Sequence, residues 1–378
     1  MMKKTFSIAV ALMCSLAMSA QTQKGVIAVA QKANTYFMNK YADPTIPTFV
    51  KKQRPSSLWT RAVYYEGLTA LEEVDTDEAN KKKYSDYATT WAEFHKFTPR
   101  NGVKTTDADD QCCEQTYIWL ARKAGQGNDK SGMLKATFEN LDNQMSTGKH
   151  EYWTWIDAIQ MAMPIYAMAY KVSGERKYLD YAMNSYQWSR NECGGGLFNT
   201  KNGFWFRDKD YVAPYKEPDG NDCYWSRGDG WVYAALVRVM TEIGPKDKYY
   251  KQLKSDFLKM SEAFASCQRE DGLWNVSLVS NNYEGKELTG SALFLYGMSW
   301  GLKNGLLKAD KYRPICDKAW KALEALVHED GFLGYVQGTG KEPSAGQPLS
   351  FTKVPDFEDY GLGCFLLGAT EYSKLLNK

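Results

Sequence analysis

The architecture of this chain follows most directly from one stretch, Glu151-Tyr-Trp-Thr-Trp-Ile-Asp157-Ala-Ile-Gln-Met-Ala-Met-Pro164, where an aromatic turn bearing a carboxylate opens into a strongly apolar helix. Thr154 and Asp157 have the spacing of a capping box, in which both side chains satisfy the first free backbone N–H groups of a helix. Alternatively, Trp153 and Trp155 beside an acid give a flat, dry wall and a proton donor, as sugar-cleaving sites need. Taken alone, the stretch favours the cap.

The composition is that of a globular protein rich in aromatic side chains. With 378 residues, 44% of them hydrophobic, the chain can bury a sizeable core in one large domain or in two. Its 12 Trp and 25 Tyr are typical of proteins that stack on sugar rings or other flat ligands. A net charge of +2 without basic runs argues against nucleic acid as a partner, because such proteins need a concentrated cationic face.

Residues 1–20 have the pattern of a secretory signal peptide. A pair of lysines, an apolar run and small residues follow one another in that order. We therefore expect export through the inner membrane to the periplasm. Cys14 follows Met13, where lipidation requires a small residue, so a lipid anchor is disfavoured. No later apolar run is long enough to span a bilayer, and no membrane insertion is expected.

The cysteines outside the leader indicate neither a disulfide framework nor a metal site. They are scattered without a C-x-x-C pair, and the chain has three histidines. We expect most of them to be small buried hydrophobic residues. They are Cys112, Cys113, Cys193, Cys223, Cys267, Cys316 and Cys364.

Apolar residues recur with the 3.6-residue period of helices almost throughout the chain, and convincing strands are nearly absent. Twelve helices spread over this length correspond to six helix pairs, about 58 residues each. They are expected near 26–40, 61–73, 80–96, 109–122, 132–144, 155–171, 176–190, 229–242, 248–267, 289–304, 311–328 and 357–375.

The lengths of the connections indicate how these helices are arranged. Connections leaving even-numbered helices are short, and those leaving odd-numbered helices are longer, the longest over 191–228 and 329–356. Antiparallel neighbours then place every long loop at one end, where the more apolar even helices begin. This predicts an all-α (α/α)6 barrel, a closed double ring over 21–378 as one domain. An open solenoid would need a polar terminal cap, and helix 357–375 is too apolar for one.

Two carboxylates are expected to face each other where the inner helices begin. Asp109 and Asp110 lie at a helix start, where an acid often only stabilises free N–H groups and the helix dipole. Asp157 begins the next inner helix and would face the same crater. A pair of facing carboxylates is the usual equipment for glycosidic chemistry, and in a closed site one of them would be protonated.

Two arginines are candidates for contact with the substrate. Arg227 lies in Trp225-Ser-Arg-Gly-Asp-Gly-Trp231, and it could form a helix-end ion pair or hold a substrate carboxylate bidentately; we prefer the second interpretation. Arg207 lies in the longest loop and could form the rim of the site or a solvated turn. Glycine-rich pieces at 193–196 and 338–341 match no nucleotide-binding fingerprint, so no cofactor is expected.

A series of motifs spanning nearly the whole chain resembles the unsaturated uronyl hydrolases of glycoside hydrolase families 105 and 88, especially the unsaturated rhamnogalacturonyl hydrolases. Each motif alone is weak, but their order is specific. They are Ala108-Asp109-Asp110, Trp153-Thr-Trp-Ile-Asp157-Ala with Met161 and Pro164, Phe204 to Asp208, Trp225 to Trp231, Asp271-Gly-Leu-Trp274, Thr289-Gly-Ser291, Gly301-Leu-Lys-Asn-Gly305 and Tyr360-Gly-Leu-Gly-Cys-Phe-Leu-Leu-Gly368.

The resemblance implies roles for individual residues. Asp157 corresponds to the catalytic acid of the family and Asp109 to its second essential carboxylate. Two departures, Glu114 where relatives often have glycine and Arg207 where some have histidine, bear on the choice of leaving sugar more than on the chemistry. The residues expected to line the substrate site are Trp59, Trp155, Trp225, Trp231, Arg207 and Arg227.

The implied reaction releases a terminal 4,5-unsaturated uronic acid from lyase-generated oligosaccharides by acid-catalysed hydration of the double bond. Asp157 would donate the proton, and Asp109 would raise the pKa of that acid by like charge, aided by burial against Trp155. The alternatives are an inverting glycosidase or polysaccharide lyase on the same barrel, and a non-catalytic carbohydrate-binding protein. The parent polysaccharide, the leaving sugar and the oligomeric state are open at this point.

Overall fold

The computed structural model describes residues 21–49, 53–125, 132–352 and 359–377. The predicted leader and Cys14 lie outside the described residues. Two antiparallel ribbons, β1 Thr48–Phe49 with β2 Gln53–Arg54 and β3 Phe198–Asn199 with β4 Phe204–Trp205, accompany an otherwise helical chain. The helices are α1 Gln23–Lys40, α2 Trp59–Val74, α3 Glu78–Phe94, α4 Ala108–Gln111, α5 Glu114–Lys123, α6 Lys135–Ser146, α7 Asp157–Ser173, α8 Arg176–Asn191, α9 Ser226–Ile243, α10 Tyr250–Ser266, α11 Leu288–Lys303, α12 Ala309–Glu324 and α13 Asp359–Leu375, with 3₁₀ turns η1 Gly132–Leu134 and η2 Cys193–Gly195.

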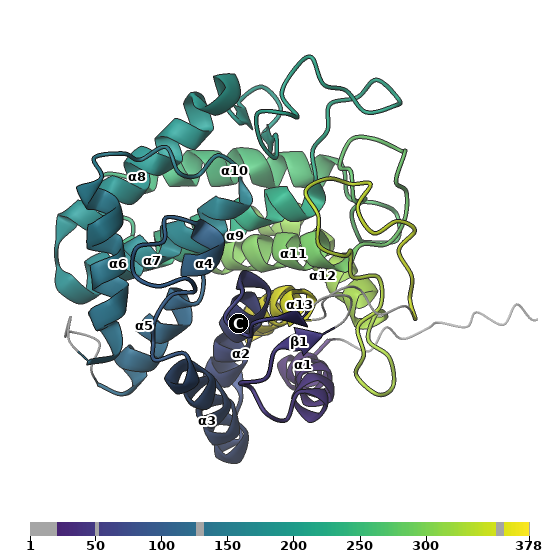
Figure 1. Ribbon diagram of the computed structural model, residues 1–378. Helices are drawn as coiled ribbons and strands as arrows, with labels where there is room; N and C mark the ends of the chain where they lie inside the picture. Colours follow the sequence, from purple (N-terminus) through teal and green to yellow (C-terminus); the bar gives the residue numbers. More distant parts are fainter. Residues whose placement is uncertain (1–20, 50–52, 126–131, 353–358, 378) are drawn as a thin grey trace, which may run out of the picture.

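The helices form two concentric rings (Figure 1). The inner ring runs α2, α4 with α5, α7, α9, α11 and α13, and α13 packs back against α2, so the ring is closed. The outer ring consists of α1, α3, α6, α8, α10 and α12. The predicted (α/α)6 barrel and its assignment of inner and outer helices are confirmed, and the open solenoid is wrong.

Inner and outer helices differ in sequence as their positions require. In α11 every residue from Leu288 to Gly301 is buried, because this helix is surrounded on all sides. In α12 the buried residues fall on one stripe, Tyr312, Cys316, Ala319, Trp320 and Leu323, which faces the inner ring. The apolar pattern of the sequence therefore encodes the ring to which each helix belongs.

The ring closes through backbone contact between α2 and α13. A Cβ built on Gly363 would lie 2.2 Å from the carbonyl oxygen of Val63, and one on Gly67 would lie 2.6 Å from the oxygen of Gly363. Real side chains do not approach so closely, so only glycine permits this approach of the two helices. The first and last inner helices thus meet without intervening side chains.

One predicted helix is divided in the structure. The segment 109–122 forms the single turn α4 and the separate helix α5, with Cys112 and Cys113 between them. The backbone N–H groups of Gln115 and Thr116 bond three residues back rather than four, which tightens the chain at this break. The division leaves Asp109 on a separate single turn, α4, rather than on the long helix that was predicted.

Several predictions about composition can be checked in the described part of the chain. All seven cysteines outside the leader are free thiols and six are buried, so they are the hydrophobic residues expected. Within residues 21–49, 53–125, 132–352 and 359–377, no helix is long and apolar enough to cross a membrane. The same residues bring together no group of three His, Cys, Asp or Glu side chains suited to a metal ion.

Candidate active site

Asp109 and Asp110, adjacent in α4, have different partners. The carboxylate of Asp110 accepts hydrogen bonds from Arg100 at 2.8 Å, Asn101 at 2.9 Å and Thr105 at 2.8 Å, and the residue is 3% exposed. It therefore fixes the loop that leads into α4. The helix is capped by Asp107, whose Oδ1 accepts from the backbone N–H of Asp109 at 2.9 Å. The Asp109 side chain is left to face the mouth of the barrel.

Asp157 is the first residue of α7 and is not part of a capping box. The cap position belongs to Ile156, and no side chain caps the helix there, so the capping interpretation of Thr154 and Asp157 is wrong. The Asp157 carboxylate instead faces Arg207, with Nε of the arginine 3.3 Å from Oδ2 of the acid. The Nη1 of Arg207 lies 2.7 Å from Oδ2 of Asp208, so the guanidinium bridges two carboxylates.

The two predicted catalytic acids affect each other's charge. Burial, together with the neighbouring carboxylates of Asp107 and Asp157, raises the pKa of Asp109 to about 8, although Arg207 opposes the rise. Near neutral pH Asp109 therefore holds its proton in this substrate-free structure. The like-charge effect is thus found at Asp109, while the rise at Asp157 that the sequence suggested stays a prediction.

Backbone hydrogen bonds hold the segment that carries Arg207 against the start of α7. The backbone N–H of Ile156 donates to the carbonyl of Arg207 at 2.9 Å, and Trp155 pairs with Asp208 as an antiparallel bridge. Just before it, the backbone N–H of Trp205 donates to the buried Asp229 at 2.9 Å. The rim loop and the start of α7 are thus joined by hydrogen bonds, and of the two alternatives for Arg207 the solvated turn is excluded.

Of the four tryptophans predicted to line the substrate site, two are partly exposed and two are buried. Trp59 and Trp155 are partly exposed, so their rings can touch a ligand. Trp225 and Trp231 are buried, at 1% and 0% exposure, and lie beneath the surface of the site. Trp231 meets Trp59 edge to face, with ring centroids 6.4 Å apart. Only the first pair is open to a ligand, and Trp231 supports Trp59 from behind.

Arg227 is not placed as an open fork for a substrate carboxylate. It is 1% exposed, and its two terminal nitrogens donate to the carbonyls of Gln337 and Gly338, each at 2.9 Å. Its guanidinium also lies 4.5 Å from the ring centroid of Trp225 and 5.1 Å from that of Tyr360. The preferred sequence interpretation is therefore corrected: Arg227 fastens the loop before α13 to the start of α9.

Sequence reasoning missed Gln337, which is the centre of this anchorage. The side chain is fully buried, and its Oε1 accepts from the indole N–H of Trp225 at 2.8 Å. Its amide nitrogen donates to the carbonyls of Glu342 and Ala345, and its own carbonyl accepts from the hydroxyl of Tyr360. A lone glutamine in a loop carries no periodic signal that could have identified it.

Comparisons with known proteins agree with this geometry. The family model described as Glycosyl Hydrolase Family 88 matches residues 29–376. An unsaturated 3S-rhamnoglycuronyl hydrolase of Alteromonas sp. strain LOR is 29% identical over 344 residues, which cover 85% of this chain and 78% of that protein.

Two solved structures are similar over almost the full length. A glycosyl hydrolase family 88 protein from Bacteroides vulgatus superposes with a TM-score of 0.83 at 29% identity, covering 94% of this chain and all of the other. A polysaccharide lyase superposes with the same score at 28% identity, covering 94% and 98% of the two chains. Since the family model spans nearly the whole sequence, this chain belongs to glycosyl hydrolase family 88 and is a glycoside hydrolase.

Proposed function

We propose that this glycoside hydrolase removes a terminal 4,5-unsaturated uronic acid from oligosaccharides left by polysaccharide lyases. The observation that carries the proposal is the pair Asp109 and Asp157, which lie at the starts of neighbouring inner helices close to Arg207, with the pKa of Asp109 raised to about 8. Hydration of an enol ether needs a single well-placed proton, and this pair supplies it near neutral pH. The name of the Alteromonas relative supports the substrate class.

The reaction begins at the double bond of the substrate. Asp157 donates a proton to C4, and the positive charge that develops at C5 is shared with the ring oxygen. Water adds to C5 and returns its proton to the carboxylate of Asp157, which restores the acid. The resulting hemiketal opens and releases the next sugar. Asp109 accepts hydrogen bonds from or donates them to the neighbouring hydroxyl groups, and the exposed rings of Trp59 and Trp155 provide flat surfaces.

Arg207 couples the binding of substrate to this proton transfer. In the substrate-free protein, Nε of Arg207 and Oδ2 of Asp157 are an ion pair without an aligned hydrogen bond, so the contact can open at small cost. A substrate carboxylate is a better-shaped partner for the planar guanidinium. When it draws Arg207 away, Asp157 loses its neighbouring cation. The proton held by Asp109 is then available to Asp157, for transfer to C4, only when substrate is present.

One spectroscopic assay separates the proposal from its rivals. Unsaturated oligosaccharides absorb in the ultraviolet through their conjugated double bond, so hydrolysis by this route makes the absorbance fall. A polysaccharide lyase, the activity named for one structural relative, makes absorbance rise from a saturated polymer. A non-catalytic binding protein changes neither signal. A rise on saturated polymer, or no change on unsaturated disaccharides, would overturn the proposal.

We propose also that the protein acts in the periplasm, because the pattern over residues 1–20 is that of a secretory leader. Lyase-generated oligosaccharides would then reach it without entering the cytoplasm. Fractionation of producing cells checks this directly, since recovery of the enzyme in the cytoplasmic fraction with residues 1–20 still attached contradicts it.

A further inference from the structure

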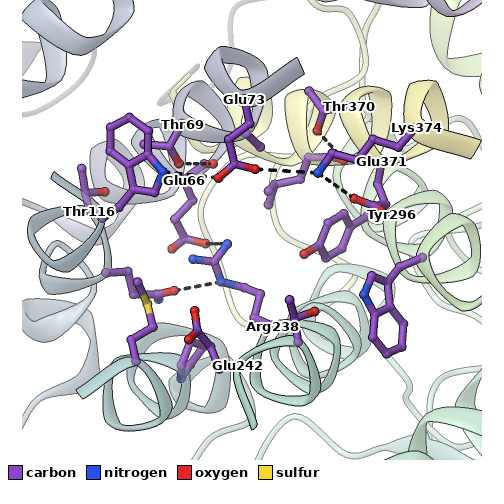
Figure 2. Close-up of a pocket in the computed structure, with 18 of the residues that line it drawn as sticks. Glu66, Thr69, Glu73, Thr116, Arg238, Glu242, Tyr296, Thr370, Glu371 and Lys374 are labelled. Atoms are coloured by element: carbon purple, nitrogen blue, oxygen red, sulfur yellow. Dashed lines mark hydrogen bonds and ion pairs between the residues drawn. The ribbon is translucent and has the colours of Figure 1, made fainter. Parts of the chain in front are cut away.

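A cavity, drawn in Figure 2, opens among the inner helices on the side away from Asp109 and Asp157. Its volume is about 340 Å³, and each of the helices α2, α5, α7, α9, α11 and α13 contributes side chains from its C-terminal half. We call this opening the lower mouth. Met168, which lines it, follows Asp157 by eleven residues in α7, roughly 16 Å along the helix axis. The lower mouth is thus separate from the two acids.

The floor of the lower mouth holds a partly buried arginine, Arg238, whose hydrogen-bonding groups are only partly satisfied. Arg238 donates from Nε to Gln115 at 3.0 Å, while its Nη1 lies 3.7 Å from Oε2 of Glu66, too far for a hydrogen bond. Glu66 is itself 2% exposed and accepts from Gln160 at 2.7 Å. Figure 2 shows the guanidinium of Arg238 and the carboxylate of Glu66 directed toward the same open space. The floor therefore offers donor capacity to a ligand.

The rim presents acceptors as well as donors. Lys374 lies 3.1 Å from Oε2 of Glu371 and 3.8 Å from Glu73, and these three side chains meet across the opening in Figure 2. Glu371 is 5% exposed, yet its Oε1 accepts no hydrogen bond from the described residues. The Nζ of Lys303 lies 3.7 Å from that oxygen, beyond hydrogen-bond distance. A buried carboxylate oxygen without a donor is costly, and a ligand hydroxyl would satisfy it.

The balance of charge favours an uncharged ligand. Each glutamate that lines the lower mouth faces a cation, including Glu242, which is held bidentately by Arg122 at 2.8 and 3.0 Å. The C-terminal ends of the inner helices converge here and add a negative potential. A free anion would be repelled both by that potential and by the carboxylates. A neutral polyol can donate to a carboxylate and accept from the neighbouring cation without adding charge.

Aromatic rings complete the set of contacts expected for a sugar. Trp119, partly exposed, and Trp300 line the cavity, and Tyr296 directs its hydroxyl toward the open space in Figure 2. Flat aromatic faces pack against the C–H face of a pyranose ring, while paired charged groups bind its hydroxyls. The cavity volume lies at the lower end of the range for small-molecule sites, which suits one or two sugar rings.

We propose that the lower mouth binds a neutral sugar, at a site independent of the hydrolytic one. The matched probes are D-galactose and D-galacturonate, which differ only in the oxidation of C6 to a carboxylate. Saturable binding of D-galactose is expected by titration calorimetry, with D-galacturonate at least ten-fold weaker. This proposal does not depend on the reaction at Asp157, so Asp157→Asn should bind D-galactose as the wild type does.

A substitution that fills the cavity tests the proposal most directly. Thr241 is exposed on α9, lines the lower mouth, and donates from Oγ1 to the carbonyl of Val237 at 2.8 Å. Thr241→Trp should block the opening and weaken D-galactose binding at least ten-fold while leaving hydrolysis unchanged. The control is Thr90→Trp on the outer helix α3, where the threonine is also exposed and bonds the Asp86 carbonyl at 2.9 Å. This control should bind as the wild type does.

A milder variant tests the chemistry of the site. Glu371→Gln keeps the shape of the side chain but removes its charge, and should weaken D-galactose several-fold. The proposal is overturned by an absence of saturable D-galactose binding, by equal affinity in wild type and Thr241→Trp, or by tighter binding of D-galacturonate. Loss of D-galactose binding in Asp157→Asn also overturns it, because the sugar would then occupy the active site.

Discussion

Arg207 lies across Asp157 at the upper mouth of the barrel, with Nε 3.3 Å from Oδ2 of the acid, while Nη1 holds Asp208 at 2.7 Å. The guanidinium is therefore retained by one carboxylate when it leaves the other. The side chains of Arg207 and Asp157 are 20% and 13% exposed, so a ligand can reach both. A ligand that draws Arg207 toward itself would therefore separate the guanidinium from Asp157.

Asp157→Asn is expected to leave the protein folded and nearly inactive. Asp157 takes no part in a capping box, and its ion pair is partly exposed, so the free energy of unfolding should change by less than about 1 kcal/mol. Loss of the transferable proton should lower turnover of an unsaturated disaccharide by roughly 100- to 10,000-fold. Denaturant titration and the absorbance assay measure the two effects. Turnover near the wild-type rate would remove Asp157 from the mechanism.

The pH profile should report the proton held by Asp109. Because its pKa is raised to about 8, the proton is present below that pH and is lost as pH rises through it, so kcat/KM should fall on the alkaline side near pH 8. Asp107 contributes to the rise, so Asp107→Asn, which preserves the cap, should move this limb to lower pH.

Asp77→Asn is the matched control for that experiment. Asp77 caps α3 by accepting from the backbone N–H of Ala79 at 2.9 Å, the same arrangement in an outer helix. Its replacement should leave the profile unchanged. An alkaline limb that stays in place in Asp107→Asn would show that Asp109 does not govern it.

Lysine substitutions at Arg227 and Arg207 should have different effects, because Arg227 anchors a loop and Arg207 is proposed to bind the substrate carboxylate. Arg227 makes two buried hydrogen bonds to backbone carbonyls, and their loss should cost about 2–4 kcal/mol of unfolding free energy. Activity should then fall equally on an unsaturated disaccharide and its methyl ester. Arg207→Lys should impair the acid more than the ester, because a point charge cannot replace a planar fork. The reverse pattern would return carboxylate recognition to Arg227.

Glu114→Gln should stabilise the protein at neutral pH. Glu114 is fully buried, neither of its carboxylate oxygens has a hydrogen-bond partner among the described residues, and burial raises its pKa well above the ordinary value. The folded protein therefore keeps this proton while the unfolded chain releases it above about pH 4.5, so stability falls as pH rises. Removing the group should gain of order 2 kcal/mol at pH 7. Near pH 4 the two proteins should unfold alike, and a gain of equal size there would contradict the explanation.

The fold could be predicted because its signals are periodic and repeated. Apolar residues mark each helix, and the position of every long loop after an odd helix orders the two rings. The break between α4 and α5 could not be predicted, since Cys112 and Cys113 suit a continuous helix. It follows from contacts of Asp110 with the preceding loop, which no local pattern reveals.

The positions of the two acids in the site could be predicted from the sequence, whereas the contacts of the two arginines could not. Asp109 and Asp157 could be paired because each begins an inner helix, a position fixed by the topology. The partners of Arg227 lie 110 and 111 residues away in a loop without periodicity, so its burial was invisible from the sequence. The interaction of Arg207 with Asp157 likewise joins two loops whose approach only tertiary structure determines.

The glycine contact between α2 and α13 also determines when, during synthesis and folding, the barrel can close. Val63 and Gly363 touch through their backbones, although they are separated by almost the whole chain. A growing polypeptide cannot make this contact until α13 has emerged from the ribosome. Until then the apolar inner face of α2 has no neighbour on that side and is open to aggregation. All six inner helices must therefore be synthesised before the barrel can close, which makes closure a step of high contact order and correspondingly slow.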